Sequence, residues 1–181
     1  RKLQLLEAGI GLFGNRSYEE ISIDAIAEAA SVSKGLIYHY FDGKRGYYNA
    51  AVELASKRLA DNLAPDPELD GPENLRRGLN AYFDYVEDHA DSYQTLLHGG
   101  LGVDDSVAKM LERTRAEIAD GIMEGLGVDQ TPRIRLAVRA WIGAVEGAAL
   151  DWLDHRDTER EEIIEILTAS LVGKLGVVLD A

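Results

Sequence analysis

The chain has 181 residues, a formal net charge of −13 at pH 7 and no cysteine. This length allows one or two domains with a buried core, and the lack of cysteine excludes disulfides and thiolate metal sites. The sequence shows no apolar run long enough to cross a membrane and no signal-peptide pattern at its start. We therefore expect a cytoplasmic protein. Because the sequence begins at Arg1 rather than Met, we also expect that a leading segment precedes it.

The negative charge is concentrated in one part of the chain. Residues 1–61 hold eight Lys and Arg and eight Asp and Glu, whereas the remainder holds 11 basic and 24 acidic residues. A neutral first part with local cations can approach DNA phosphates while the acidic remainder faces away from them. A basic arm in a leading segment would add to this. The distribution is compatible with a nucleic-acid partner but does not establish one.

The first predicted helix covers residues 2–13. Leu5, Leu6 and Phe13 fall at helical spacing within it, and Gly14 is a suitable stop. We expect this helix to pack across the next two and to complete a three-helix core.

Residues 22–44 have the pattern of two short helices joined by a tight turn. In the first helix, Ile23, Ala27 and Ala30 form an apolar stripe, and Ser22 is a suitable N-cap. The two alanines are small enough for a second helix to cross closely there. Two helices joined by a short turn form a helix-turn-helix, whose second helix enters the DNA major groove.

The second of these helices has an inward and an outward face. Val32 in the turn is expected to pack inward together with Ile37 and Phe41, and Ser33 is placed to cap the helix. The residues left on the outward face, where a partner can be met, are Lys34, Gly35, Tyr38 and His39.

The stretch also carries a set of residues that is specific when taken as a whole. The set consists of Ile26, Ala27, Ala30, Ser31, Val32, Ser33, Gly35, Ile37, Tyr38, Tyr40, Phe41 and Lys44. It resembles the DNA-binding signature of TetR-family transcriptional regulators. The family usually has glycine at the position of Ser31, where the chain makes a left-handed turn, so we expect Ser31 to adopt that turn at some cost. The motif covers about a quarter of the chain, and the rest matches the family in helix pattern and length.

The resemblance implies that the second helix of the pair reads DNA. A lysine such as Lys34 can donate to a guanine edge, Gly35 lets the backbone come close, and Tyr38 offers its ring to a thymine methyl. Leu36 is open between a base contact and a core position. Ser22, Ser33 and Lys44 are expected at phosphates, which position the protein without specifying sequence. The full predicted DNA-binding set is Ser22, Ser33, Lys34, Gly35, Leu36, Tyr38, His39, Tyr40 and Lys44.

A connecting helix is predicted over residues 44–61. Prolines and glycine within residues 64–72 end it and start the next helix. We expect a helix-turn-helix DNA-binding domain over residues 1–48 and a helical ligand-binding and dimerisation domain over residues 49–181. The fold class is therefore all-α, with about nine helices.

Three local signals mark connections in the second part. Thr131 before Pro132 predicts a helix start, and Thr158 with Glu161 predicts a capping box that opens the last helix. Residues 99–102, Gly-Gly-Leu-Gly, form a connection rather than a phosphate loop, because no strand precedes them and no Lys-Ser/Thr follows.

The last two predicted helices indicate a homodimer. Residues 137–153 are apolar on more than one face, and the small residues Gly143, Ala144, Gly147 and Ala148 permit close helix approach. Paired with a symmetry mate, the two helices would form a four-helix bundle, and in the TetR family they form the dimer interface. The alternative is that both faces are buried within one chain.

The resemblance also implies a small-molecule effector site in the second domain. Pockets between helices are usually apolar with a few polar anchors. The predicted ligand-binding residues are Tyr82, Tyr85, Val86, His89, Tyr93, Met110, Thr114, Glu117, Ile118, Trp141 and Val145. Ordinary core packing is the competing interpretation for most of them, and the sequence does not identify the ligand.

We therefore expect a homodimeric, ligand-responsive regulator that binds palindromic operator DNA, most often a repressor in this family. Effector binding would favour a dimer whose recognition helices no longer match half-sites about 34–36 Å apart. A small all-α enzyme, with Glu117 and His89 as its only acid/base candidates, and a helical protein-interaction module remain as alternatives. No nucleophile–base motif and no metal-ligand spacing occur, so we predict no catalytic centre, no cofactor and no metal.

Overall fold

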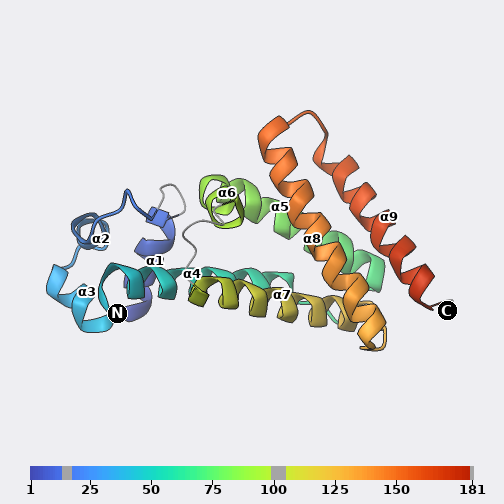
Figure 1. Ribbon diagram of the computed structural model, residues 1–181, viewed down its shortest axis with the longest axis horizontal. Coiled ribbons are helices and arrows are strands. Elements are labelled where there is room, and N and C mark those ends of the chain that lie inside the picture. The colour runs from blue at the N-terminus through green and yellow to red at the C-terminus, as the bar shows by residue number, and fades with distance from the viewer. Residues whose placement is uncertain (14–17, 99–104, 180–181) are drawn as a thin grey trace. The chain divides into compact units, whose positions relative to one another are not determined.

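The computed structural model describes residues 1–13, 18–98 and 105–179 (Figure 1). Within these ranges every regular element is an α-helix, which confirms the predicted all-α fold. The helices are α1 (Lys2–Phe13), α2 (Ile23–Ala29), α3 (Lys34–Tyr40), α4 (Gly43–Leu63), α5 (Gly71–Asp88), α6 (Ala90–His98), α7 (Asp105–Gly125), α8 (Pro132–His155) and α9 (Arg160–Leu179). The predicted stop at Gly14 and the connection over residues 99–102 lie outside the described residues. None of the helices in the described ranges is both long and apolar enough to span a membrane.

The chain divides into two compact units. The first combines Arg1–Arg58 with Asp88–Leu111, and the second combines Leu59–Glu87 with Glu112–Ala181. These units are defined by packing, so the predicted boundaries of the functional domains stay a prediction.

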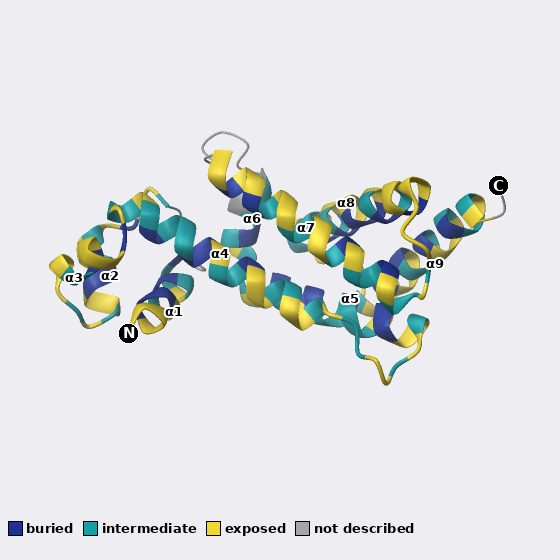
Figure 2. Ribbon diagram, turned by 90° about the horizontal axis from the view of Figure 1, so that it is seen from below, coloured by how far each residue is buried: buried dark blue, intermediate teal, exposed yellow. Residues whose placement is uncertain are grey.

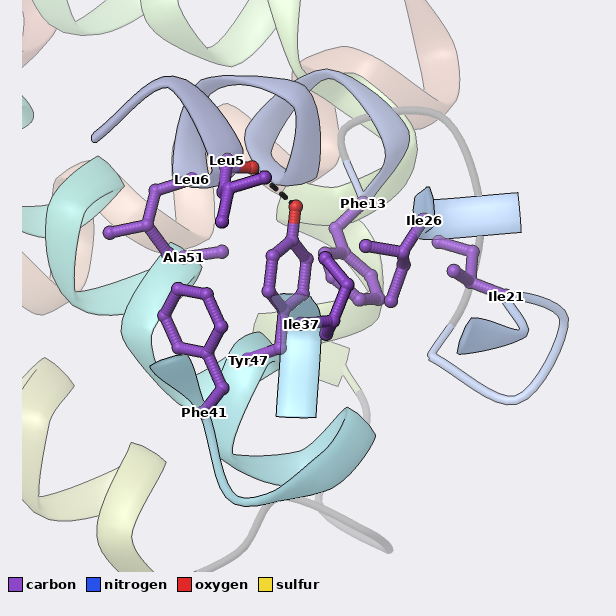
Figure 3. Close-up of a cluster of buried hydrophobic side chains, with 9 residues drawn as sticks. All are labelled: Leu5, Leu6, Phe13, Ile21, Ile26, Ile37, Phe41, Tyr47 and Ala51. Carbon is purple, nitrogen blue, oxygen red and sulfur yellow. Dashed lines mark hydrogen bonds between the residues drawn. The ribbon is translucent and has the colours of Figure 1, made fainter. Parts of the chain in front are cut away.

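The first unit is built on a core to which α1, α2, α3 and α4 all contribute. The hydroxyl of Tyr47 on α4 donates to the carbonyl oxygen of Leu5 on α1, and its ring meets Phe41 edge to face with 5.0 Å between centroids (Figure 3). Burial raises the pKa of Tyr47 to about 12, because the phenolate would lose its water there. The buried residues of this core are Leu5, Leu6, Phe13, Ile21, Ile26, Ile37, Phe41, Tyr47 and Ala51.

Gly9 allows α1 to approach α4 closely. A Cβ atom at this position would lie 2.6 Å from the hydroxyl oxygen of Tyr47, which is far inside van der Waals contact. The close crossing of the two helices therefore depends on a residue without a side chain.

The turn between α2 and α3 is a Schellman motif. The N–H of Val32 donates to the carbonyl of Ala27 at 2.9 Å, and Ser31 takes a left-handed conformation with a φ of 51°. Val32 is half-buried and packs against the core of the first unit. The predicted left-handed turn at Ser31 and the inward position of Val32 are both confirmed.

Both short helices begin at the serines predicted to cap them. The Oγ of Ser22 accepts from the N–H of Ala25 at 3.1 Å, and the Oγ of Ser33 accepts from the N–H of Leu36 at 3.4 Å. The apolar stripe of α2 is rotated slightly from the expected line, because Ile26 is fully buried whereas Ile23 and Ala30 are only half-buried.

A second apolar cluster in the first unit joins α4 to the start of α7. Val52 packs with Val107 and Met110, and the side-chain amide of Asn49 donates to the hydroxyl of Ser106 at 2.9 Å. The first turns of α7 therefore belong to the same packed unit as the helix-turn-helix.

The second unit contains α5, α8, α9 and most of α7. The indole N–H of Trp141 on α8 donates to the carbonyl of Leu167 on α9 at 2.8 Å. Phe83 on α5 meets Trp152 on α8 edge to face with 5.3 Å between ring centroids. These contacts hold α8 between α9 on one side and α5 on another, in agreement with the expectation that α8 is buried on more than one face.

Hydrogen bonds close two helix ends in the second unit, the start of α8 and the end of α7. The Oγ1 of Thr131 accepts from the N–H of Ile134 at 3.2 Å, which confirms the predicted start of α8. α7 ends in a Schellman motif, in which the N–H of Val128 donates to the carbonyl of Met123 at 3.1 Å and Gly127 has a φ of 63°.

The predicted capping box at the start of α9 is wrong. α9 begins at Arg160, and the hydroxyl of Thr158 donates to Asp157 at 3.3 Å. Thr158 is fixed in the preceding loop because its carbonyl accepts from the indole N–H of Trp152 at 3.0 Å.

A capping box that the sequence analysis missed opens α5. There Asp70 accepts from the N–H of Glu73 at 2.9 Å, and the Glu73 carboxylate accepts from the N–H of Asp70 at 3.4 Å. Pro72 lies inside this first turn, near the predicted helix start.

Candidate nucleic-acid interface

The helix α3 buries Ile37, packs Leu36 partly against the core and leaves most of its surface exposed. Ile37 has no exposed surface, whereas 59% of Tyr38 is exposed. Lys34, Gly35, His39 and Tyr40 are exposed as well, and Figure 2 shows part of α3 in the colour of exposed residues. The predicted outward positions of Lys34, Gly35, Tyr38 and His39 are therefore confirmed, and their contact with DNA stays a prediction.

Leu36 lies between the two faces. It is half-buried and packs against the apolar core of the first unit. Of the two interpretations left open by the sequence, this favours the core position. The capping serines, Ser22 and Ser33, are both exposed beside α3.

Lys34 is engaged in an ion pair that the sequence analysis did not predict. Its ammonium pairs with the carboxylate of Asp24 on α2, and the two side chains are 57% and 68% exposed. Each residue lies in the first turn of its helix, so the turn of the helix-turn-helix brings the two helix starts together. The sequence did contain a signal for this pair: an acidic residue, Asp24, in the first turn of the first short helix and a basic residue, Lys34, in the first turn of the second.

Lys44 is held at the start of α4. Its ammonium lies 4.2 Å from the centroid of the Tyr18 ring and 3.5 Å from the carbonyl oxygen of Glu19. A cation over an aromatic face is attracted by the ring quadrupole. Tyr18 in turn lies against Tyr48, with 5.0 Å between ring centroids. These two contacts position the Lys44 ammonium without any contribution from DNA.

The predicted ligand-binding residues differ in burial and in the unit to which they belong. His89, Tyr93 and Met110 lie in the first unit and the other eight in the second. The indole N–H of Trp141 donates to the carbonyl oxygen of Leu167 and so is not available to a ligand. Glu117 is exposed. Tyr82, Val86, Tyr93, Met110, Trp141 and Val145 are buried, and Tyr85, His89, Thr114 and Ile118 are half-buried. As a single ligand site, the set stays a prediction.

The second unit contains a charged network between α7 and α8 that the sequence did not disclose. The Nε of Arg115 lies 2.7 Å from the Oε1 of Glu146, with 24% and 23% of the side chains exposed. Glu112 pairs with Arg139 and lies 3.7 Å from Arg115. Burial lowers the pKa of Arg115, but the hydrogen bond and the charge of Glu146 outweigh it and raise the pKa above its usual value. The network joins the two helices through paired charges.

Several small and apolar residues of α8 and α9 are exposed, and we call them the outer face of these helices. Gly143, Ala144 and Gly147 on α8 are exposed, and a Cβ atom at Gly143 or Gly147 would meet nothing within 4 Å. On α9, Val172 and Val177 are 64% and 74% exposed. This face is therefore not buried within the chain, contrary to the alternative left open by the sequence.

The geometry defines a class of protein: a helix-turn-helix protein with an exposed second helix and a helical second part. Comparison with known families is more specific. Residues 5–51 match the family described as bacterial regulatory proteins of the tetR family, and residues 72–173 match the tetracyclin repressor-like C-terminal domain. The chain belongs to the TetR family, and it is a ligand-responsive DNA-binding transcriptional regulator.

Individual relatives agree with this assignment. A tetR-family regulator from Streptomyces coelicolor is 36% identical, with a TM-score of 0.88 over 98% of this chain and 81% of that chain. The transcriptional activator FasR from Mycolicibacterium smegmatis is 25% identical over 91% of this chain and 78% of that protein. FadR from Bacillus subtilis, solved in complex with stearoyl-CoA, shares the fold at 15% identity, with a TM-score of 0.70 over 94% of this chain and 99% of that chain.

Proposed function

We propose that the protein is a homodimeric repressor that acts on chromosomal DNA in the cytoplasm and leaves a palindromic operator when an effector with an acyl chain binds. The observation that carries the proposal is the outward face of α3, where Lys34, Tyr38, His39 and Tyr40 are exposed beside two capped helix starts. Ile37 is buried and Leu36 packs against the same core, so the exposed side chains of Lys34, Tyr38, His39 and Tyr40 serve a purpose other than core packing.

The proposed division of labour on DNA follows from side-chain chemistry. Lys34 and Tyr38 face base edges, because a lysine can donate to guanine and a ring can contact a thymine methyl. Ser22, Ser33 and Lys44 meet phosphates, together with the N–H groups at the helix starts. His39 and Tyr40, whose rings lie 5.0 Å apart, flank this surface.

The proposed dimer forms through α8 and α9. Their exposed apolar face offers small residues that allow close approach, and a twofold axis would bring the same face of a second copy against it. Large exposed apolar patches on a soluble protein usually mark an interaction site. The resulting four-helix bundle would set the separation of the two copies of α3.

The proposed effector class rests on fold-level likeness. FadR from Bacillus subtilis shares the fold of this chain and was solved with stearoyl-CoA. The second unit also has a core rich in aromatic and aliphatic side chains, among them Tyr82, Phe83 and Trp141. We propose that this protein acts as a regulator and carries out no catalysis on the effector.

A release assay tests the proposal. The operator is first located by footprinting the full-length protein on the DNA upstream of its own gene. Stearoyl-CoA is then titrated into the protein–operator complex at constant salt, with coenzyme A as the matched control without an acyl chain. Release by stearoyl-CoA alone supports the proposal. Operator affinity that neither compound changes would overturn the effector class, and turnover of stearoyl-CoA would favour an enzyme.

The direction of regulation needs a separate readout. A promoter carrying the operator and fused to a reporter is compared with and without the protein. Lower expression in its presence supports repression. Higher expression would make the protein an activator, the role given in the name of its relative FasR.

A further inference from the structure

The helix-turn-helix carries unusually little positive charge for a DNA-binding surface. Between Ser22 and Lys44 the chain has two Lys and Arg residues and three Asp and Glu residues, a net charge of −1. Lys44 is already in contact with Tyr18 and Glu19. The electrostatics of this surface therefore depend strongly on Lys34, which stands at the start of α3.

Lys34 is in an electrostatically unfavourable place unless it is paired. It is the first residue of α3, where the helix dipole presents partial positive charge and disfavours a cation. Asp24 lies in the first turn of α2, where an anion is favoured, and its carboxylate pairs with the Lys34 ammonium. The helix start of α2 favours the Asp24 charge, and the carboxylate offsets the unfavourable position of Lys34. Asp24 nevertheless places a negative charge beside the surface that meets DNA.

Pairing has different consequences for the two modes of DNA binding. Non-specific binding comes from cations that replace counterions at phosphates, and its salt dependence reports how many take part. A lysine that is neutralised by a neighbouring carboxylate contributes little to this mode. Specific binding offers the ammonium a fixed acceptor on a base edge in place of the carboxylate.

We propose that Asp24 is a specificity-determining residue that holds Lys34 away from random DNA and releases it only to an operator acceptor. This inference rests on the proposed function in that Lys34 must lie at the DNA surface. Removing the Asp24 charge would then strengthen binding to any duplex more than binding to the operator, and the ratio of the two affinities would fall.

The test compares Asp24→Asn with Glu28→Gln in the full-length protein. Glu28 is an exposed acid on the same helix that forms no ion pair with any residue the structure describes, so both variants lose one charge and only one loses the pair. Affinity for a random duplex and for the operator is measured by fluorescence anisotropy between about 50 and 200 mM salt. Asp24→Ala serves as a second variant, and circular dichroism checks that each variant is folded.

The expected result is that Asp24→Asn binds the random duplex about two- to fivefold more tightly than wild type, in keeping with the strength of an exposed ion pair. Its salt dependence steepens by about 0.9, as for one added phosphate contact. Glu28→Gln shows neither change. In a Lys34→Ala background, the effect of Asp24→Asn shrinks to that of losing one exposed charge, as in Glu28→Gln, because the pair is already lost.

Two outcomes would overturn the inference: equal behaviour of Asp24→Asn and Glu28→Gln, or an Asp24→Asn effect that is undiminished in the Lys34→Ala background. In both cases a wild-type preference for the operator would leave the proposed function standing. If wild type binds neither duplex, the proposed function fails and the inference with it.

Discussion

Two exposed surfaces of the chain, the outward face of α3 and the outer face of α8 and α9, present different kinds of side chain. The first presents aromatic rings and a lysine paired with an acid, on a helix that begins at a serine cap. The second presents glycine, alanine and valine without a cover. Exposure alone does not define function. A surface of rings and paired charges suits polar DNA, whereas a surface of small apolar residues suits a second copy of the same chain.

The largest expected effect comes from placing a charge in the apolar surface. Val172→Asp should weaken the dimer by at least about 3 kcal/mol, because an unpaired carboxylate would be buried at the interface. Sedimentation equilibrium measures the change. Ala116→Asp, on the exposed side of α7, is the matched control and should leave the dimer intact. A folded Val172→Asp protein that remains dimeric would remove α9 from the interface.

The packing of α1 against α4, in the core to which α3 also contributes, can be tested independently of both surfaces. Gly9→Ala should destabilise the first unit by about 1–3 kcal/mol, because its new methyl group overlaps the Tyr47 ring. Gly11→Ala, on the same helix with open space at its Cβ position, should be neutral or stabilising by up to about 1 kcal/mol. Thermal unfolding by circular dichroism compares the two. Equal stability of these variants would contradict the close crossing of α1 and α4.

The DNA surface itself is tested by removing a ring. Tyr38→Ala should weaken operator binding by about 1–2 kcal/mol, as for loss of one specific base contact, and leave dimerisation and folding unchanged. Leu3→Ala removes an exposed apolar side chain from α1 in the same unit and should change nothing.

Lys44→Ala should lower the slope of operator affinity against salt concentration by about 0.9, as for loss of one phosphate contact. If Tyr38→Ala and Lys44→Ala both bind the operator with wild-type affinity, the outward face of α3 and Lys44 do not form the DNA-binding surface.

The smallest effect concerns two turns of the same geometry. Ser31 and Gly127 both hold the left-handed position of a Schellman motif, and a side chain there costs about 1 kcal/mol. Ser31→Gly should therefore stabilise the protein by about 1 kcal/mol, and Gly127→Ser should destabilise it by a similar amount. Urea unfolding followed by fluorescence measures both. Shifts of the same sign would show that the two turns are not equivalent.

Local chemistry explains what could be read from the sequence. The caps at Ser22, Ser33 and Thr131 involve a side chain and a backbone N–H three residues away, so short patterns are sufficient to predict them. The TetR-like motif is local as well, and it covers the whole of α2 and α3. The same kind of pattern failed at Thr158, because a bond from Trp152 fixes that residue in the loop.

Side-chain contacts that depend on how helices pack could not be predicted from the sequence. Lys44 meets Tyr18 across 26 positions, and Arg115 meets Glu146 across two helices. Such contacts require the crossing geometry of the elements, which periodicity does not contain. The predicted ligand set has the same weakness, since it was drawn from helical faces without knowledge of which faces meet. It remains to be tested by binding.

The most direct test of DNA recognition by α3 is binding of the wild-type, full-length protein to the DNA upstream of its own gene, compared with a random duplex of equal length at two salt concentrations. We predict tighter binding to the upstream DNA, saturation at two chains per site, and weaker binding as salt rises. Equal affinity for both duplexes across every upstream segment, or binding that salt does not change, would contradict the assignment of α3 to the DNA major groove.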